Sequence, residues 1–509
     1  MNEAGRPDYV IGVDIGTSST KAIAYDLDGR ALASGSAPYR TMLTVDGGAR
    51  QRPEEWWNAV VTALRGASVS GSHCRGIAFG AQLGTYVALD GRGRPIEDAW
   101  TWQDGQASVV LSRLAATLDL GRVASELRTW LPPGANWPLP RLLWLQRHRA
   151  ETLARARAVV MPKDYIVLRL TGRLVTDPSS WRGLVRPDGT THEEALSALG
   201  LPDLVPPREV STACAGTLRA DVAELIGQPS STPVFLGTGD YAAALLGTGV
   251  AADGDQFDIG GTSEHLGVLS SRREPDTGQV VVPYLEGESP GLYLNYGVSS
   301  NGGSVLEWLG QTLLPHHASE RRGAELTAMV ESEAQEGGKP LFFVPYLAGE
   351  RSPIWDADAS GAWIGLRSEH SPARLARAAL EGVAFNLRQI RDMNPLMRRG
   401  APIRASGGTA RSAVWNQIKA DVLASPIAVA ANTDAGTLGA ALHAASGAGL
   451  FASPAAAAST MTSIGRTFEP DPSAVDRLDD SYHRYREIAS VVAGLTQFMQ
   501  FNDSERNPL

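Results

Sequence analysis

The sequence predicts two similar α/β domains, one in each half of the chain. "VDIGTSSTKA" at residues 13–22 reappears at residues 257–266 as "FDIGGTSEHL", with one glycine inserted. In both places an apolar strand-like stretch runs into a Gly-Thr-Ser turn, and a second strand is expected to follow. A chain of 509 residues has room for two or more domains of ~100–200 residues each. The repeat spans about half the chain instead of ~20–50 residues, so a solenoid is not expected.

The first half is predicted to open with a three-stranded meander. The Asp28-Gly29 pair between the second and third strands is typical of a tight hairpin. A helix is expected next, because Pro53 is followed by two acidic residues and the pattern ends at Gly66. The strands of this half are expected at 9–14, 20–26, 31–39, 75–90 (with a break at Gly80) and 231–240, the last running into a helix of small residues.

The second half is predicted to repeat the strand, turn and strand from about residue 255. A helix is expected to begin at Ser371-Pro372, because apolar residues follow at helical spacing from Ala376 to Ile390. The final residues, "FNDSERNPL", are polar and are expected to fray. We therefore predict an N-terminal domain at 1–250, a C-terminal domain at 251–495 and a polar tail at 496–509.

Composition and charge favour a cytoplasmic enzyme. The net charge of −9 argues against a nucleic-acid-binding surface, which needs a basic footprint. Two cysteines, Cys74 and Cys214, cannot form a disulfide framework or a Cys-based zinc site. The start "MNEAGRPDYV" does not resemble a signal peptide, and no apolar run approaches the ~20 residues of a membrane span. The nine histidines have no metal-ligand spacing.

The repeated turn has the chemistry of a phosphate site. Gly16, Thr17 and Ser18 offer N–H groups and hydroxyls on one concave side, and glycine lets an anion approach the backbone. Asp14 would suit a Mg²⁺ ion held on the phosphates. The second turn, Gly261-Thr262-Ser263, would hold the same phosphates from the opposite side of a cleft. A plain hairpin is the alternative for either copy alone.

Longer motifs resemble the FGGY family of carbohydrate kinases across residues 9–450. Both turns resemble its phosphate motifs, and "NWPLPRLLWLQRH" (136–148) resembles one family signature, with Arg141 where lysine is usual. "FVPYLAGERSPIWDADASGAWIGL" (343–366) with "LARAALEGVAFNLR" (375–388) resembles the other, except for Arg374. The resemblance implies two ribonuclease H-like (actin-like ATPase) domains with an interdomain cleft, ATP and Mg²⁺ as cofactors, and a homodimer.

The resemblance places the catalytic base at Asp240. In "GTGDYAAALLGTG" (237–249) this aspartate follows a strand at the start of a glycine-flanked helix. Phosphoryl transfer needs a group that takes the proton of the attacking hydroxyl. A helix N-terminus favours the ionised carboxylate that this role requires. An N-cap without a catalytic role is the alternative.

The resemblance also implies a sugar site beside this base. "AQLGT" (81–85) aligns with the family's Gln-Met-His-Gly turn, so Gln82, Leu83 and Gly84 are expected to contact the sugar. "TWQDGQ" aligns with Trp-Asn-Asp-x-Arg, which places Asp104 on sugar hydroxyls and Trp102 against a C–H face, while Gln106 replaces the usual arginine. A surface aspartate with satisfied hydrogen bonds, beside a core tryptophan, is the alternative.

The strand, turn and helix at 405–427 resemble the adenosine site of the family. Gly407 and Gly408 would let adenine slide against the backbone, with Thr409 and Ser412 nearby. Gly303, in "NGGS", is expected to line the same cleft. A turn that binds no ligand is the alternative.

The substrate expected from these motifs is a small sugar, phosphorylated by ATP. "PKDYIVLRLTG" (162–172) and "GDYAAALLGTGV" (239–250) are most similar to xylulokinases, whereas "TWQDGQA" (101–107) leans toward gluconokinases. "TDPSSWRGL" (176–184) departs from both. We expect D-xylulose to be converted to D-xylulose 5-phosphate, with gluconate, ribulose or a polyol as alternatives. A non-catalytic ATP-binding protein of the actin type is the alternative from another class.

Overall fold

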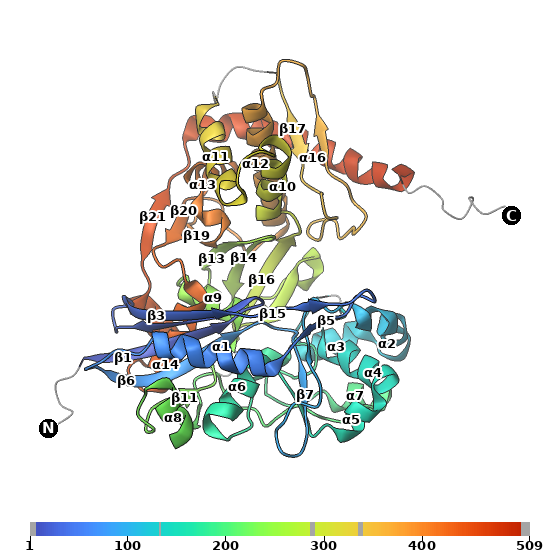
Figure 1. Cartoon of the computed structure of the whole chain (residues 1–509). Helices are drawn as coiled ribbons and strands as arrows, with labels where there is room; N and C mark the ends of the chain where they lie inside the picture. Colours follow the sequence, from blue (N-terminus) through green and yellow to red (C-terminus); the bar gives the residue numbers. More distant parts are fainter. Residues whose placement is uncertain (1–6, 132–133, 286–290, 334–338, 500–509) are drawn as a thin grey trace. The chain divides into compact units, whose positions relative to one another are not determined.

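The computed structural model describes residues 7–131, 134–285, 291–333 and 339–499, and it divides into two compact units (Figure 1). The first unit comprises Met1–Asp253, Val281–Leu294 and Asn432–Ser463. The second comprises Gly254–Val280, Asn295–Ala431 and Ile464–Leu509. The described residues form two seven-stranded mixed sheets. The predicted α/β class with two domains is confirmed.

The first sheet has the order β10-β11-β6-β1-β2-β3. The seventh strand, β12, lies off this path and also pairs with β6. Antiparallel β1, β2 and β3 form the predicted meander, and the tight turn before β3 places Gly29 at φ +81°. β6 runs parallel to β1, and β11 and β12 run parallel to β6, so the carboxyl ends of these strands lie at the same edge as the end of β1. The bounds are β1 Asp8–Ile15, β2 Ser19–Tyr25, β3 Ala31–Pro38, β6 His73–Ala81, β10 Cys214–Thr217, β11 Pro233–Phe235 and β12 Thr238–Gly239.

Helix α1 (Pro53–Gly66) covers one face of this sheet, beside β2 and β3 (Figure 1). It begins at the predicted proline, and its buried face carries Trp56 and Trp57. Gly35 and Gly66 allow the close packing, because a Cβ on Gly35 would lie 2.4 Å from the carbonyl oxygen of Ala63. The predicted helix over 52–66 is confirmed.

On the sheet's other face, α14 (Ala435–Gly447) packs against β1 and β6 and against α9 (Asp240–Gly247). A Cβ on Gly12 would lie 1.8 Å from the carbonyl oxygen of Thr437. A Cβ on Gly439 would lie 1.7 Å from the carbonyl oxygen of Ala243. Only glycine permits backbones to approach this closely. These contacts bring a segment from late in the chain into the first unit.

The remaining elements of the first unit surround this layered core. The small strands are β4 Met42–Leu43, β5 Ala49–Gln51, β7 Val87–Leu89, β8 Ala99–Trp100 and β9 Ala158–Val160. The helices are α2 Leu111–Thr117, α3 Leu120–Leu127, α4 Pro138–His148, α5 Ala150–Arg155, α6 Pro162–Thr171, α7 Glu193–Leu199, α8 Ala220–Ile226 and α15 Pro454–Met461, with short 3₁₀ turns η1 Gln106–Val110 and η2 Pro178–Trp181.

The second sheet has the order β15-β16-β14-β13-β19-β20-β21. β13 and β14 form the predicted second hairpin, and β13 runs parallel to β19 with Gly260 opposite Gly407. The bounds are β13 Gln256–Gly260, β14 Glu264–Ser270, β15 Val280–Pro283, β16 Tyr293–Ser299, β19 Ile403–Gly407, β20 Ile427–Ala430 and β21 Ile464–Phe468, with a separate pair β17 Phe342–Val344 and β18 Ala362–Ile364.

Helix α12 (Pro372–Met393) is central to the second unit and begins as predicted. The Ser371 hydroxyl accepts a hydrogen bond from the Arg374 N–H (3.0 Å), which caps the helix. Its apolar face packs with the other helices into one buried cluster that includes Phe385, Trp415 and Tyr482. The other helices are α10 Gly303–Leu313, α11 Ser319–Ser332, α13 Ala413–Leu423 and α16 Pro472–Met499, with η3 Pro275–Thr277 and η4 Thr409–Arg411.

The two compact units differ from the contiguous domains that the sequence predicts. The main boundary lies after Asp253, close to the predicted 250/251, but 281–294 and 432–463 belong to the first unit. For 432–463 the reason is the glycine-mediated packing of α14 on β1. Residues 500–509 of the predicted polar tail lie outside the described residues, and α16 extends to Met499. Within the described parts, no helix has the length and apolar character needed to cross a membrane.

Candidate active site

The first phosphate turn joins β1 to β2 and keeps two amide groups free. The Gly16 N–H donates to the Ser19 carbonyl (3.0 Å), and the Tyr39 hydroxyl donates to the Gly16 carbonyl (2.5 Å). The Gln51 side chain donates to the Thr17 carbonyl (2.6 Å). These bonds hold the carbonyl groups of the turn, while neither the Thr17 nor the Ser18 N–H donates to another described residue. Such a turn is suited to an anion.

Three carboxylates from distant parts of the chain lie close to this turn. Asp14 is on β1, Asp240 begins α9 just after β12, and Asp434 precedes α14. Asp14 lies opposite Gly80 of β6, which in turn lies opposite Thr238 of β12, so the strand register brings the first two together. Lys21 on β2 pairs with Asp434 (2.6 Å). Asp434 and Lys21 are site residues that the sequence reasoning missed.

The pKa values of Asp14 and Asp240 are raised. Burial, together with the negative charges of Asp240 and Asp434, raises the pKa of Asp14 to about 7, against the opposing effect of Lys21. Burial raises the pKa of Asp240 to about 6, although its carboxylate accepts a hydrogen bond from the Tyr241 N–H (2.8 Å) and feels the charge of Arg182. Raised carboxylate pKa values in such a cluster are typical of functional sites.

The Asp14 carboxylate fits a hard cation. Its Oδ1 is buried and has no hydrogen-bond partner among the described residues. Gly436 at the start of α14 leaves it space, because a Cβ there would lie 2.9 Å from Asp14 Oδ2. A buried, unpaired carboxylate oxygen near two other carboxylates suits Mg²⁺, which prefers oxygen ligands.

A second acidic cluster in the first unit is already neutralised. Among the described residues, Glu126, His192 and Glu194 are the one group of three with ligand atoms close enough for a metal ion. Arg186 pairs with Glu194 (2.6 Å) and with Glu126 (3.6 Å), and His192 Nδ1 accepts from the Ala195 N–H (3.2 Å). This arrangement is an ion-pair network.

The predicted sugar turn adjoins the carboxylates. The Gln82 N–H donates to the Ile15 carbonyl (3.0 Å). The Leu83 side chain packs against Gly239, because a Cβ on that glycine would lie 2.6 Å from Leu83 Cγ. Gly84 has φ +72° and faces Asn136. The structure therefore places Gln82 at the end of β1 and Leu83 against Gly239, the residue before Asp240, while Gly84 lies beside Asn136.

Asp104 is buried in a network of ion pairs. It is 1% exposed; Oδ1 accepts from Arg141 Nη1 (2.7 Å), and Oδ2 accepts from the Ala49 N–H (2.9 Å) and from Arg50. The carboxylate thus has a structural role in the interior. The alternative of a surface aspartate beside a core tryptophan is wrong, because Asp104 is 1% exposed and Trp102 is 44% exposed. Its contact with sugar remains a prediction.

Trp102 lies next to the first phosphate turn. Its Nε1–H donates to the Thr17 hydroxyl (2.9 Å), and the residue is 44% exposed. An exposed indole held at one end is available for stacking against a ligand. The structure therefore gives the predicted sugar platform a fixed position.

The second phosphate turn joins β13 to β14 and touches the start of α10. The Gly303 N–H donates to the Gly261 carbonyl (2.7 Å), and the Gly302 N–H donates to the Thr262 carbonyl (3.0 Å). The Thr262 and Ser263 N–H groups donate to no other described residue. A Cβ on Gly261 would meet nothing within 4 Å. Gly303 therefore lies next to this turn, and its place in a nucleotide cleft remains a prediction.

The predicted adenosine turn lies at the same edge of the second sheet. Gly407 has φ +94°, and a Cβ there would lie 2.1 Å from the Gly260 carbonyl oxygen. Gly408 faces open space. Thr409 donates to Glu264 (3.4 Å), and the Ser412 hydroxyl caps α13 by accepting from the Trp415 N–H (3.4 Å).

A buried ion-pair triad supports both turns of the second unit. Lys419 on α13 pairs with Asp258 (2.7 Å) and Glu264 (2.5 Å), and all three side chains are at most 1% exposed. Glu264 directly follows the Gly-Thr-Ser turn, so Lys419 anchors β13 and β14 at that point. The sequence prediction did not include this lysine. The pattern that could have indicated it is a single cation in the otherwise largely uncharged helix "AVWNQIKADVL" (413–423).

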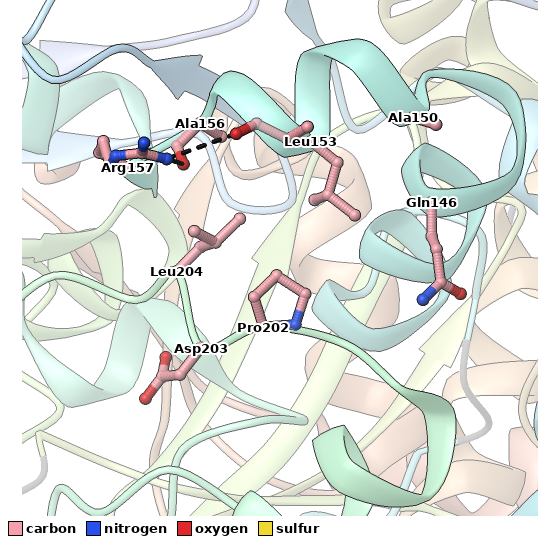
Figure 2. A pocket seen from close by; sticks show the side chains of 9 residues that line it. Gln146, Ala150, Leu153, Ala156, Arg157, Pro202, Asp203 and Leu204 are labelled. Carbon is pink, nitrogen blue, oxygen red and sulfur yellow. Dashed lines mark hydrogen bonds between the residues drawn. The ribbon is translucent and has the colours of Figure 1, made fainter.

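A pocket of about 560 Å³ lies elsewhere in the first unit, beside α5 and residues 202–204 (Figure 2). Its polar groups are already bonded: Gln146 donates to the Gly200 carbonyl (2.7 Å), and Arg157 donates to the Ala156 carbonyl (3.1 Å). None of the predicted site residues lines it. We therefore do not assign the active site to this pocket.

The chain belongs to the FGGY family of carbohydrate kinases. Residues 9–247 match the N-terminal domain of that family, and residues 259–448 match its C-terminal domain. The fold and the two phosphate turns agree with this membership, so the protein is an ATP-dependent sugar kinase, a phosphotransferase.

Individual relatives carry two substrate names. A xylulose kinase of Lactococcus lactis is 30% identical over 512 residues, covering 97% of this chain and 99% of the relative. A gluconokinase of Bacillus subtilis is 28% identical over 516 residues, covering 97% and 96%. The solved structure of a ligand-bound xylulose kinase from Lactobacillus acidophilus superposes with a TM-score of 0.85 at 25% identity, covering 97% of this chain and 100% of that one.

Proposed function

We propose that the protein transfers the γ-phosphoryl group of Mg-ATP to the terminal hydroxyl of D-xylulose, with Asp240 as the general base. The observation that carries this proposal is the juxtaposition of Asp240 at a helix start with Asp14 and the first phosphate turn. Relatives named as xylulose kinases, and the motifs at 162–172 and 239–250, favour D-xylulose over gluconate, ribulose or a polyol.

Asp240 meets the requirements of a base. Its pKa of about 6 lies close to the operating range, so the carboxylate is mostly ionised at pH 7.5 and still accepts a proton well. Its place in the first turn of α9 favours the ionised form through the helix dipole. The Tyr241 N–H bond fixes one oxygen and leaves the other for the substrate hydroxyl.

Asp14 would hold Mg²⁺, and the free amide groups of the turns would hold the phosphates. The ion supplies charge neutralisation on the phosphate oxygens. In the first unit the donors are the N–H groups of Thr17 and Ser18; in the second they are those of Thr262 and Ser263. Gly408 would give adenine its access to the backbone.

The test is ADP release with Mg-ATP and a panel of D-xylulose, D-ribulose, D-gluconate and polyols. Wild type is compared with Asp240→Asn, which keeps the shape of the side chain but cannot accept the proton. We expect D-xylulose to be the preferred acceptor and kcat to fall roughly 10²- to 10⁴-fold in the variant. Asp221→Asn is a matched control, because Asp221 also lies in the first turn of a helix but is exposed.

Two results would contradict the proposal. ADP release that needs no sugar would favour a non-catalytic ATP-binding protein of the actin type. Turnover that survives Asp240→Asn would remove Asp240 from the role of base. A stronger preference for gluconate would retain the mechanism and replace the substrate.

A further inference from the structure

The segment η2 is fixed to the strand that leads into the catalytic base. Asp177, just before η2, pairs with Lys163 (2.7 Å), and both side chains are 1% exposed. Ser179 and Ser180 donate hydrogen bonds to the same carboxylate. The Ser179 hydroxyl also bonds to the Thr238 hydroxyl on β12 (2.8 Å), two residues before Asp240. This buried network leaves η2 little freedom to move.

Arg182 follows η2 directly and is held from the other side as well. The next residue, Gly183, has φ +83°, and a Cβ there would lie 2.0 Å from the ring of Trp137. The backbone on both sides of Arg182 is therefore packed in place. Its guanidinium is close enough to Asp240 to act on the charge of that carboxylate.

The partly buried Arg182 side chain lacks the ion-pair partners that two other arginines of this unit have among the described residues. Its Nε is buried without a hydrogen-bond partner, and the residue forms no ion pair within the described parts of the chain. By contrast, Arg141 binds Asp104 (2.7 Å), and Arg186 binds Glu194 (2.6 Å). A guanidinium has five N–H donors, and buried donors without partners are rare in folded proteins. Among the described residues, the fold gives the buried Nε–H of Arg182 no acceptor.

We propose that Arg182 is a substrate-binding residue whose guanidinium donates to an acceptor oxygen of the sugar, next to the hydroxyl that Asp240 deprotonates. This inference rests on the proposed function, because it places the sugar against Asp240. The acceptor is either the carbonyl oxygen of a ketose or the carboxylate of a sugar acid. Charge-assisted bonds from arginine serve both.

The test compares wild type with Arg182→Met and Arg182→Lys, using D-xylulose, xylitol and D-gluconate as acceptors. Kinetics give KM for the sugar and KM for ATP, and calorimetry gives Kd for each sugar. We expect Arg182→Met to raise KM and Kd for the preferred sugar roughly 10- to 100-fold and to leave KM for ATP unchanged. Arg182→Lys should recover part of the loss. Arg186→Met is the matched control and should change neither KM.

The three sugars distinguish the two acceptors. Only D-xylulose has a ketone, so a loss confined to it identifies the carbonyl oxygen. A larger loss with D-gluconate identifies a carboxylate. Either pattern supports the inference. We also expect the urea midpoint of Arg182→Met to match wild type, because no folded-state bond is removed.

Failure of this inference is separable from failure of the proposed function. If wild type phosphorylates a sugar and Arg182→Met keeps the same KM for it, or raises KM for ATP alone, the role assigned to Arg182 is wrong while the kinase activity stands. If no sugar is phosphorylated but Arg182→Met weakens sugar binding, the binding role stands and the proposed function fails. A wild type that binds none of the three overturns both.

Discussion

Replacing Asp104 with asparagine separates its structural role from a role in sugar binding. The change removes the negative charge between Arg50 and Arg141, whose side chains are 14% and 1% exposed. Removing one partner of a buried ion pair costs about 3–5 kcal/mol, because the remaining charge is left uncompensated. For domains of 150–250 residues each kcal/mol lowers Tm by about 2–4 °C, so a fall of about 6–20 °C is expected.

Thermal unfolding followed by circular dichroism measures this loss. Asp221→Asn is the control, since its ion pair with Arg219 is exposed and exposed pairs contribute little to stability. A Tm of Asp104→Asn within a degree or two of that control would refute the reasoning from buried ion pairs. If KM for the sugar rises while Tm stays constant, Asp104 acts on the substrate, as the sequence predicts.

Three further predictions concern the base, the second unit and the packing of α14. Because Asp240 acts in its ionised form and has a pKa of about 6, kcat/KM should be constant above that pH and fall about tenfold per pH unit below it; a pH–rate profile without this limb would contradict the assignment. Lys419→Met should destabilise the second unit by about 3–5 kcal/mol in urea unfolding, because two buried carboxylates lose their cation. The control Lys339→Met removes an exposed ion pair (3.7 Å) and should cost under about 1 kcal/mol. Gly439→Ala should lower expression of folded protein, since its Cβ would lie 1.7 Å from a carbonyl oxygen of α9, while Gly494→Ala, in a helix with open space around it, should stabilise by about 0.5–1 kcal/mol.

Features encoded by short motifs were predictable from the sequence. The two Gly-Thr-Ser turns, the opening meander and the helix starts at Pro53 and Pro372 depend on neighbouring residues, and the structure places them as expected. The position of Asp240 near Asp14 also follows, because Asp14 lies near the carboxyl end of β1 and Asp240 follows β12, and both strands run parallel to β6.

Features that depend on distant partners were not predictable in the same way. The partners of Asp104 lie 54 and 37 residues away in the sequence, and no local pattern joins them. From the sequence alone, Lys419 would be expected on the surface. It is buried because its helix packs where it can pair with Asp258 of β13. Residues 432–447 contain the small residues that close packing needs, but their attachment to β1 depends on glycines more than 400 residues earlier, such as Gly12.

The attachment of α14 to β1 also sets an order for events on the ribosome. At ~5–20 residues per second, α14 is made roughly 20–80 s after β1. During that interval α14 does not yet cover its face of the first sheet, so the apolar side chains on that face are exposed to solvent and to chaperones. We therefore expect nascent chains stopped before residue 435 to associate with chaperones, and full-length chains to be released from them.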